Sequence, residues 1–221
     1  MKHRTGNSYV TLAVAGALFA YSAMSADKPA AAETKAKTAG LSTEEMMKKA
    51  EAAGTPGPAH KALEALVGDW NTEGRCWMAP DGPPTENKGS AKVQWILGGR
   101  FVQEDFDGEF MGKPFHGISI TGYDNMKKKY VGSWVDDMST GMFISEGTAD
   151  TEGKLFTFHG KMDDPMTGQK NKPFKFVVHI LDPNKHTFEM HDLTLGEKSK
   201  TMEMTYTRKQ SARASTRSGG K

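Results

Sequence analysis

The sequence predicts an all-β protein: a single antiparallel up-and-down β-barrel of about ten strands, preceded by short helices. From Gly68 onward, short stretches of alternating apolar and polar residues follow one another without a helical pattern between them. Residues suited to tight bends separate these stretches, as at 80–82 (Pro-Asp-Gly) and 182–184 (Asp-Pro-Asn). A sandwich remains the alternative, but closure into a barrel removes the exposed edges that an open meander would leave.

Neither face of the expected strands over residues 130–136 and 174–181 is uniformly polar, and apolar and polar residues occur together in both strands. Successive residues of a strand point to opposite faces, so this mixture indicates an interior that is partly filled by side chains and keeps a modest pocket. The expected strands span residues 70–77, 88–96, 101–106, 115–123, 130–136, 142–149, 155–162, 174–181, 187–195 and 200–208.

Residues 1–26 have the three parts of a secretory signal peptide. Lys2 and Arg4 form a basic start, residues 9–20 form an apolar run too short to span a bilayer comfortably, and residues 23–25 are small or compact enough for cleavage. We therefore expect an exported protein of the periplasm or cell envelope, or a secreted one, with no transmembrane segment after signal removal. A retained membrane anchor is the alternative.

The cysteine content excludes two ways of stabilising or anchoring the chain, an intramolecular disulfide and a lipoprotein attachment. Cys76 is the only cysteine, so no intramolecular disulfide can form. It also lies far downstream of the expected cleavage region, which excludes a bacterial lipoprotein attachment. The exported domain must hold itself together by its core.

Residues 27–40 are rich in Ala, Lys, Thr and Pro and contain no large apolar side chain, and we interpret residues 27–41 as a disordered linker. Residues 42–66 form a short helical segment. Its first helix is predicted by the S-x-x-E pattern of Ser42 and Glu45, in which the two side chains satisfy free backbone donors, and it should end at Gly54. A helical turn over residues 60–66 should follow.

That second turn would place Leu63, Leu66 and Val67 together as a plug on the barrel domain, which spans residues 67–209. Residues 210–221 carry basic residues and no acidic ones, and we expect a disordered tail. The formal net charge of the whole chain is only +2, which argues against nucleic acid as a partner.

Two ends of the barrel domain resemble the lipocalin-like proteins. Gly68 and Trp70 match their G-x-W motif, and Arg208 on the last strand occupies the place of the arginine that covers the tryptophan. The resemblance implies a structural role for these three residues, with the guanidinium stacked on the indole.

Five short motifs extend this likeness in the right order along residues 59–209. Together they resemble the bacterial domain-of-unknown-function family numbered 1579, which implies a calycin-like barrel and brings no established activity, ligand or catalytic residue. The motifs are LGGRF (97–101), PFHG (114–117), GYD (122–124), WVD (134–136) and YTR (206–208).

If the barrel holds a ligand, we expect aromatic rings around it and one or two polar anchors. The candidate ligand-binding residues are Trp95, Arg100, His116 and Trp134. Arg100 suits an anionic group at the barrel mouth because of its planar donors, and Glu104 shares its face by strand parity. The alternative for Arg100 is an ion pair with Glu104 or Asp136 that fixes strand register.

No motif supports metal binding or nucleophilic catalysis. The histidines are scattered over separate strands, without an H-x-H or H-E-x-x-H pattern, so we expect no metal site. No G-x-S-x-G motif occurs, and we assign no catalytic residue; the sequence does not identify a cofactor.

The leading functional hypothesis is therefore a barrel that binds a small, partly apolar molecule. One alternative is an enzyme, an isomerase or hydrolase, that uses a buried carboxylate together with Arg100. Such an enzyme should show a carboxylate with a raised pKa facing an open cavity. The other alternative is a filled barrel that acts only as a surface interaction module. The sequence does not give the oligomeric state.

Overall fold

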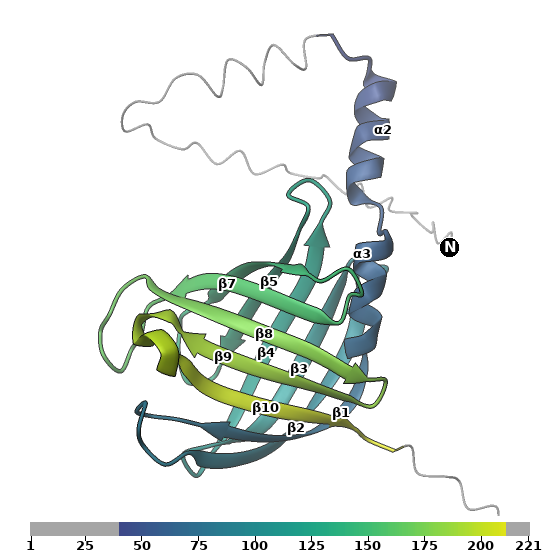
Figure 1. The fold of residues 1–221 in the computed structure, drawn as a ribbon. Coiled ribbons are helices and arrows are strands. Elements are labelled where there is room, and N and C mark those ends of the chain that lie inside the picture. Colours follow the sequence, from purple (N-terminus) through teal and green to yellow (C-terminus); the bar gives the residue numbers. More distant parts are fainter. Residues whose placement is uncertain (1–39, 211–221) are drawn as a thin grey trace, which may run out of the picture. The chain divides into compact units, whose positions relative to one another are not determined.

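The computed structural model describes residues 40–210, in which ten antiparallel strands form one closed barrel (Figure 1). The expected signal peptide and nearly all of the expected linker and basic tail lie outside the described residues. The strands are β1 (Gly68–Cys76), β2 (Thr85–Ile96), β3 (Phe101–Phe110), β4 (Lys113–Asp124), β5 (Lys129–Asp136), β6 (Phe143–Ala149), β7 (Leu155–Met162), β8 (Lys172–Asp182), β9 (Lys185–Asp192) and β10 (Lys200–Arg208).

Each strand pairs with its neighbours in the chain, and β1 closes the ring by pairing with both β2 and β10. In the register of the closure, Trp70 lies opposite Arg208 and Thr72 opposite Tyr206. The predicted up-and-down β-barrel is thus confirmed. Closure gives every strand of the barrel a neighbour on both sides.

The predicted strand over residues 187–195 is wrong at its end. The strand stops at Asp192, and Leu193–Lys198 form a 3₁₀ segment, η2. The Asp192 carboxylate accepts hydrogen bonds from the backbone N–H and the hydroxyl of Thr194, at 2.9 and 2.6 Å. Gly196 then adopts a φ of 59°, a left-handed conformation that suits glycine. These local bonds compete successfully with strand continuation.

The first predicted helix is present as α2 (Thr43–Gly54). Its start has the expected reciprocal cap, because the Glu45 N–H donates to Ser42 Oγ at 3.2 Å and the Ser42 N–H donates to Glu45 Oε2 at 2.8 Å. Beyond its last turn, the Asn125 side chain donates to the carbonyls of Ala53 and Thr55, at 2.9 and 2.8 Å.

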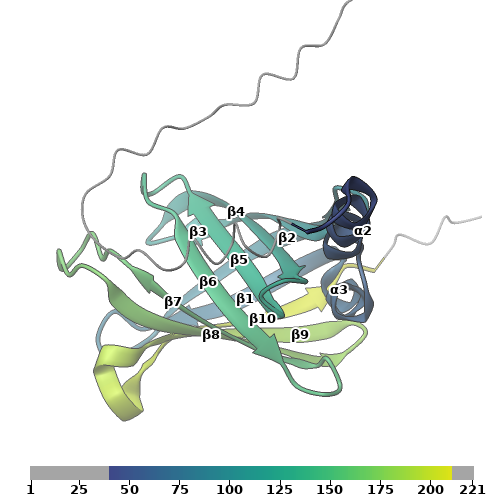
Figure 2. The same ribbon diagram turned by 90° about the horizontal axis from the view of Figure 1, so that it is seen from above.

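The second helical stretch, α3 (Pro58–Lys61) followed by the 3₁₀ helix η1 (Ala62–Leu66), lies at one end of the barrel (Figure 2). Leu63 is fully buried there. Trp70 Nε1 donates to the Leu66 carbonyl at 2.8 Å, and the Tyr130 hydroxyl donates to the Ala59 carbonyl at 2.9 Å. The predicted plug therefore closes the end at which β1 begins and β10 ends.

Aromatic side chains fill much of the interior. Near the plug, Trp70 and Phe156 are almost completely buried, while Phe174 fills the opposite part of the barrel. Rings contact one another in edge-on pairs, such as Tyr130 with Phe156 at 5.1 Å between centroids. Among residues 40–210, no helix is both long and apolar enough to cross a membrane.

Candidate functional site

The barrel encloses a cavity of about 120 Å³. An apolar protein cavity of roughly 150 Å³ admits benzene, so this space suits a molecule of single-ring size or smaller. Most of the wall is apolar, with Leu63 and Leu66 of the plug at one side. The aromatic side chains that line it, apart from Tyr206, are Trp134, Phe143, Phe156, Phe158, Phe176 and Phe188.

Glu104 is the only Asp, Glu, Lys or Arg among the residues lining this cavity. The Tyr206 hydroxyl, from β10, donates to Glu104 Oε1, from β3, at 3.0 Å. Glu104 lies inside the barrel and is partly exposed, because it lines the cavity. Burial raises the pKa of Glu104 to about 7, opposed by the Tyr206 hydrogen bond and assisted by the negative charge of Asp105.

The same environment acts on Tyr206. Burial raises the pKa of the Tyr206 hydroxyl well above its usual value, and the adjacent Glu104 carboxylate raises it further. Tyr206 therefore stays protonated across the physiological range and acts as a hydrogen-bond donor to Glu104. The pair offers the cavity one carboxyl group that titrates near neutral pH.

His186 of β9 also lines the cavity, as do the hydroxyl residues Thr121, Ser133 and Ser145, and it is only 5% exposed. Its ring stacks on Tyr206, with 4.3 Å between centroids, and meets Trp70 edge-on at 4.5 Å. Burial lowers the pKa of His186 to about 4, and the charge of Arg208 lowers it further, so the imidazole is neutral at neutral pH. Its Nδ1 has no hydrogen-bond partner among the described residues.

Strand register gathers these groups. His186 lies opposite Tyr206 in the β9–β10 pair, and Tyr206 lies opposite Thr72 in the β10–β1 pair. The Thr72 hydroxyl is also buried and without a partner in the described part of the chain. Buried polar atoms are normally paired, so two unpaired ones on residues opposite Tyr206 are unusual, and one of them, His186 Nδ1, belongs to a residue of the cavity wall.

Glu104 enters the interior through ordinary strand alternation. Val102 and Phe106, two residues to either side, are buried, and Glu104 occupies the inward position between them. An acidic residue between two buried apolar residues on one strand face is the sequence signal for this site. From the sequence, the parity of Glu104 predicts only a face shared with Arg100 and a possible ion pair between the two.

Trp134 lines the cavity as the sequence hypothesis requires. Its Nε1 donates to Asp136 Oδ2 at 2.9 Å, and its ring stacks on Phe115 at 6.2 Å between centroids. A Cβ atom added at Gly117 would lie only 2.2 Å from the indole ring. Gly117 thus provides the space in which Trp134 lies against β4.

The other three predicted ligand-binding residues do not line the cavity, so the structure does not bring the four together. Trp95 donates from Nε1 to Glu64 Oε2 at 2.6 Å, at the plug. His116 is exposed, with Nδ1 2.9 Å from Asp107 Oδ1.

Arg100 is also exposed, and its Nη1 donates to the Leu97 carbonyl at 3.0 Å. It lies in the turn before β3, so strand parity does not place it on the face of Glu104. Neither of the ion pairs considered for it is formed. Glu104 bonds with Tyr206, and Asp136 accepts from Trp134 and from the backbone of the turn after β5.

Gly68, Trp70 and Arg208, for which we expected a structural role, lie together at the plug end of the barrel. The Arg208 guanidinium lies 4.1 Å from the centroid of the Trp70 ring, and its Nη1 donates to the Val67 carbonyl at 2.8 Å. Gly68 has a φ of 141°, and a Cβ there would lie 2.0 Å from Arg208 Nη1. Only glycine fits that position while the arginine covers the tryptophan.

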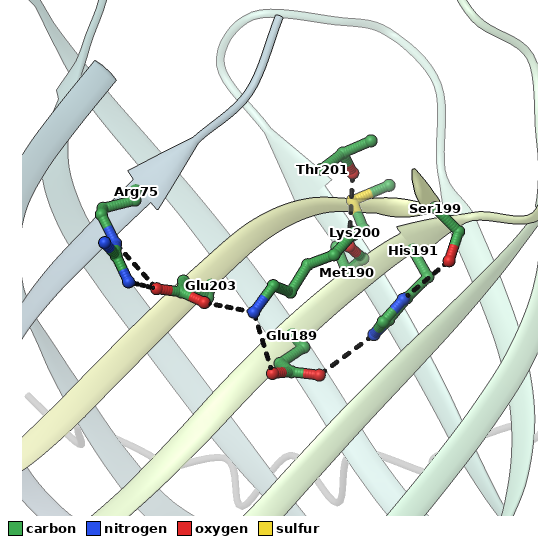
Figure 3. A network of polar contacts seen from close by, with 8 residues as sticks. All are labelled: Arg75, Glu189, Met190, His191, Ser199, Lys200, Thr201 and Glu203. Atoms are coloured by element: carbon green, nitrogen blue, oxygen red, sulfur yellow. Dashed lines mark hydrogen bonds and ion pairs between the residues drawn. The ribbon is translucent and has the colours of Figure 1, made fainter. Parts of the chain in front are cut away.

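A second polar cluster lies on the outer side of β1, β9 and β10 (Figure 3). We call it the outer network. Glu203 binds Arg75 and Lys200, and Lys200 also approaches Glu189 at 3.4 Å. His191 links Glu189 to Ser199, with both contacts at 3.1 Å.

The donor set for a metal ion is sparse. Within residues 40–210, no group of three or more His, Cys, Asp or Glu side chains is arranged to hold a metal. In the cavity itself, Glu104 and His186 are the two residues of these types.

Comparison with known proteins gives a family match and several similar folds. The model of the family described as "Protein of unknown function (DUF1579)" matches residues 55–208. The comparison with curated proteins gives no significant match.

Among solved structures, Rv2717c from M. tuberculosis is similar, with 16% identity and a TM-score of 0.53 over 71% of this chain and 100% of that one. This likeness supports the barrel fold. The S-type phycobiliprotein lyase CPES from Guillardia theta has 11% identity and a TM-score of 0.48, over 69% of this chain and 93% of the lyase.

Proposed function

The chain belongs to the family described as "Protein of unknown function (DUF1579)". We propose that it binds a small, partly apolar molecule inside its barrel. The family brings no activity with it, so the proposal rests on the interior of the barrel. We further propose that binding takes place outside the cytoplasm, as the expected signal peptide over residues 1–26 suggests. N-terminal mass analysis of the protein from fractionated cells tests that location.

One observation supports the binding proposal: the interior holds a cavity with aromatic walls, a carboxyl group and one buried polar atom, His186 Nδ1, without a partner among the described residues. A barrel that served only as a surface module would have a filled interior, because protein cores pack to the density of organic crystals. Here about 120 Å³ stays open, and it borders the unpartnered His186 and the Glu104 carboxyl group. Apolar walls with a few convergent polar groups are typical of small-molecule sites.

The test compares the native barrel with a variant whose cavity is filled. Val178 lines the cavity on β8, whereas Leu181 on the same strand is 45% exposed. We expect benzene and phenol, used as probes in calorimetry, to bind the wild type and Leu181→Phe equally and to lose at least tenfold in affinity for Val178→Phe. The matched control adds a phenylalanine to the same strand without entering the cavity.

Unchanged probe binding by a folded Val178→Phe would remove the interior as the binding site. If the wild type binds neither probe, and native mass spectrometry of protein purified from its own cells finds no added mass, the proposal fails. An added mass that disappears on denaturation supports it and identifies the molecule.

Glu104 favours a second candidate function, an isomerase or hydrolase that transfers protons. Its carboxyl group faces the cavity with a pKa of about 7, which is the property expected of a general acid or base. Arg100 lies outside the cavity, so Glu104 and Tyr206 would be the reacting pair. We expect such an enzyme to accelerate deuterium exchange at the α-carbon of cyclopentanone, and Glu104→Gln to abolish the acceleration. No acceleration by the wild type argues against proton abstraction.

A further inference from the structure

The charge of the cavity wall has one sign. Glu104 can carry a negative charge, and no Lys or Arg lines the cavity to neutralise it. His186 adds no positive charge, because burial keeps it neutral above a pKa of about 4. The positive charge of Arg208 is felt at His186, but the Arg208 side chain covers Trp70, bonds to Val67 and Pro183 and does not itself line the cavity.

The carboxyl group also has unused hydrogen-bonding capacity. An ionised carboxylate offers about four acceptor sites, and the Tyr206 hydroxyl is its one donor among the described residues. A bound molecule that carries an N–H or O–H group can therefore reach Glu104 without displacing a protein partner. An anionic molecule would instead meet the carboxylate without any cation to offset the repulsion.

The remaining wall is suited to a positive charge. The faces of aromatic rings carry partial negative charge, and six aromatic residues besides Tyr206 line the space. Enclosure by aromatic rings is a common means of binding ammonium groups, and methylated ones lose less hydration on entering an apolar space. The volume of about 120 Å³ restricts the choice to a compact molecule.

From this combination we infer that the cavity selects a small methylated amine in its protonated form, with its N–H directed to Glu104 and its methyl groups against the aromatic rings. The inference rests on the proposed binding function and narrows it to one chemical class. A protonated tertiary amine satisfies the carboxylate and the rings at once, whereas a neutral apolar molecule leaves the carboxylate without a new partner.

Binding of a cation should be linked to the protonation of Glu104. A positive charge beside the carboxylate favours its ionised form and lowers its pKa, so binding near pH 6.5 should release a proton. The other groups near Glu104 do not titrate in this range, because the pKa of Tyr206 lies well above it and that of His186 well below. The negative charge of Asp105, next to Glu104 on β3, helps to raise the pKa of Glu104.

The experiment compares trimethylammonium with tert-butanol, a neutral molecule of similar shape, by calorimetry at pH 6.5 in buffers of different ionisation enthalpy. We expect trimethylammonium to bind the wild type at least tenfold more tightly than tert-butanol and with proton release. Glu104→Gln should lose both the preference and the proton release. The control Glu109→Gln, an exposed position on the same strand, should keep both.

Equal or tighter binding of tert-butanol, or an unchanged preference in Glu104→Gln, would overturn the inference while leaving the proposed binding function intact. If neither molecule binds, the inference fails; the proposed binding function fails with it only if benzene and phenol also do not bind and native mass spectrometry finds no added mass. If Glu104→Gln does not fold, the pH dependence of binding by the wild type alone tests the inference. Its affinity for trimethylammonium should fall by about tenfold for each pH unit below 6, while that for tert-butanol stays constant.

Discussion

The barrel has two polar clusters, one inside and one outside, which differ in whether their acidic groups have basic partners. In the outer network, every acidic group has basic partners: Glu203 binds Lys200 and Arg75, and Glu189 approaches Lys200 and His191 (Figure 3). Lys200 first, and then Arg75, lower the pKa of Glu203. Inside, Glu104 has a single hydroxyl donor and a raised pKa.

The difference indicates what each cluster contributes. Balanced, partly exposed ion pairs such as those of the outer network add little free energy and help to fix the register of adjacent strands. An unbalanced carboxyl group in an apolar interior costs stability when it ionises. Residues that are unfavourable for folding are commonly found at binding or catalytic sites, which is why Glu104 is the better functional candidate.

The largest expected effect concerns the pH dependence of Glu104. Its pKa is 4.5 in the unfolded chain and about 7 in the folded one, so the folded state binds more protons between these values and loses stability as the pH rises through them. The loss amounts to about 3 kcal/mol. The unfolding free energy of Glu104→Gln minus that of the wild type should therefore be about 3 kcal/mol larger at pH 8 than at pH 4.5.

Urea unfolding at the two pH values measures this difference, with Glu109→Gln as the control at an exposed position of the same strand. A difference between wild type and Glu104→Gln that is the same at both pH values would show that Glu104 titrates normally. The interior and outer clusters would then not differ in the direction in which they shift the pKa of their acidic groups.

A comparable effect of opposite sign is expected from His186. Its pKa falls from 6.5 in the unfolded chain to about 4 in the folded one, so its contribution to stability is present above 6.5 and is lost as the pH falls toward 4. Between pH 4.5 and 6.5 the slopes from Glu104 and His186 should nearly cancel in the wild type. Relative to the wild type, Glu104→Gln should gain stability with rising pH and His186→Phe should lose it.

Unfolding free energies at pH 4.5, 5.5 and 6.5 provide the measurement. Each variant should diverge from the wild type by about 2 kcal/mol over this range, because these two pH units cover most but not all of each shift of about 2.5 pKa units. Parallel curves for all three proteins would contradict the opposed titrations.

A smaller effect is expected from Tyr206→Phe, which removes the hydrogen-bond donor to Glu104 and keeps the ring that stacks on His186. Leaving a buried charged acceptor without its donor costs about 2 kcal/mol at pH 8, and losing a hydrogen bond to the neutral acid costs about 1 kcal/mol at pH 5. The pKa of Glu104 should rise further, which carboxyl NMR titration detects. An unchanged pKa would mean that the hydroxyl does not support the carboxylate.

Much of the fold could be predicted from the sequence, because its signals are local. Alternation and turn residues located the strands, and the Ser42 and Glu45 pattern located the start of α2. The end of β9 was missed because the Asp192 side chain bonds to Thr194 instead of letting the strand continue.

The cavity site could be predicted only in part, because its members meet through closure of the barrel. Glu104 and Tyr206 are separated by 102 residues, and their contact depends on which strand face points inward and on the stagger between strands. Trp134 was identified as an aromatic residue at a motif. Arg100 and His116 were selected for their chemistry, but a turn and an outward position keep them outside the cavity.

The smallest expected effect is that of Arg75→Ala in the outer network. Arg75 is 53% exposed and bonds to Glu203, which keeps Lys200 as a partner when the arginine is removed. Because exposed ion pairs are screened by salt, the loss of unfolding free energy should stay below about 1 kcal/mol at low salt and approach zero at high salt. Urea unfolding of the wild type and of Arg75→Ala at two salt concentrations measures both values, with Lys88→Ala, a second exposed ion-pairing residue of the neighbouring strand, as the control. A loss of several kcal/mol that persists at high salt would show that the outer network holds the barrel closed, and the contrast with the interior would then lie in function alone.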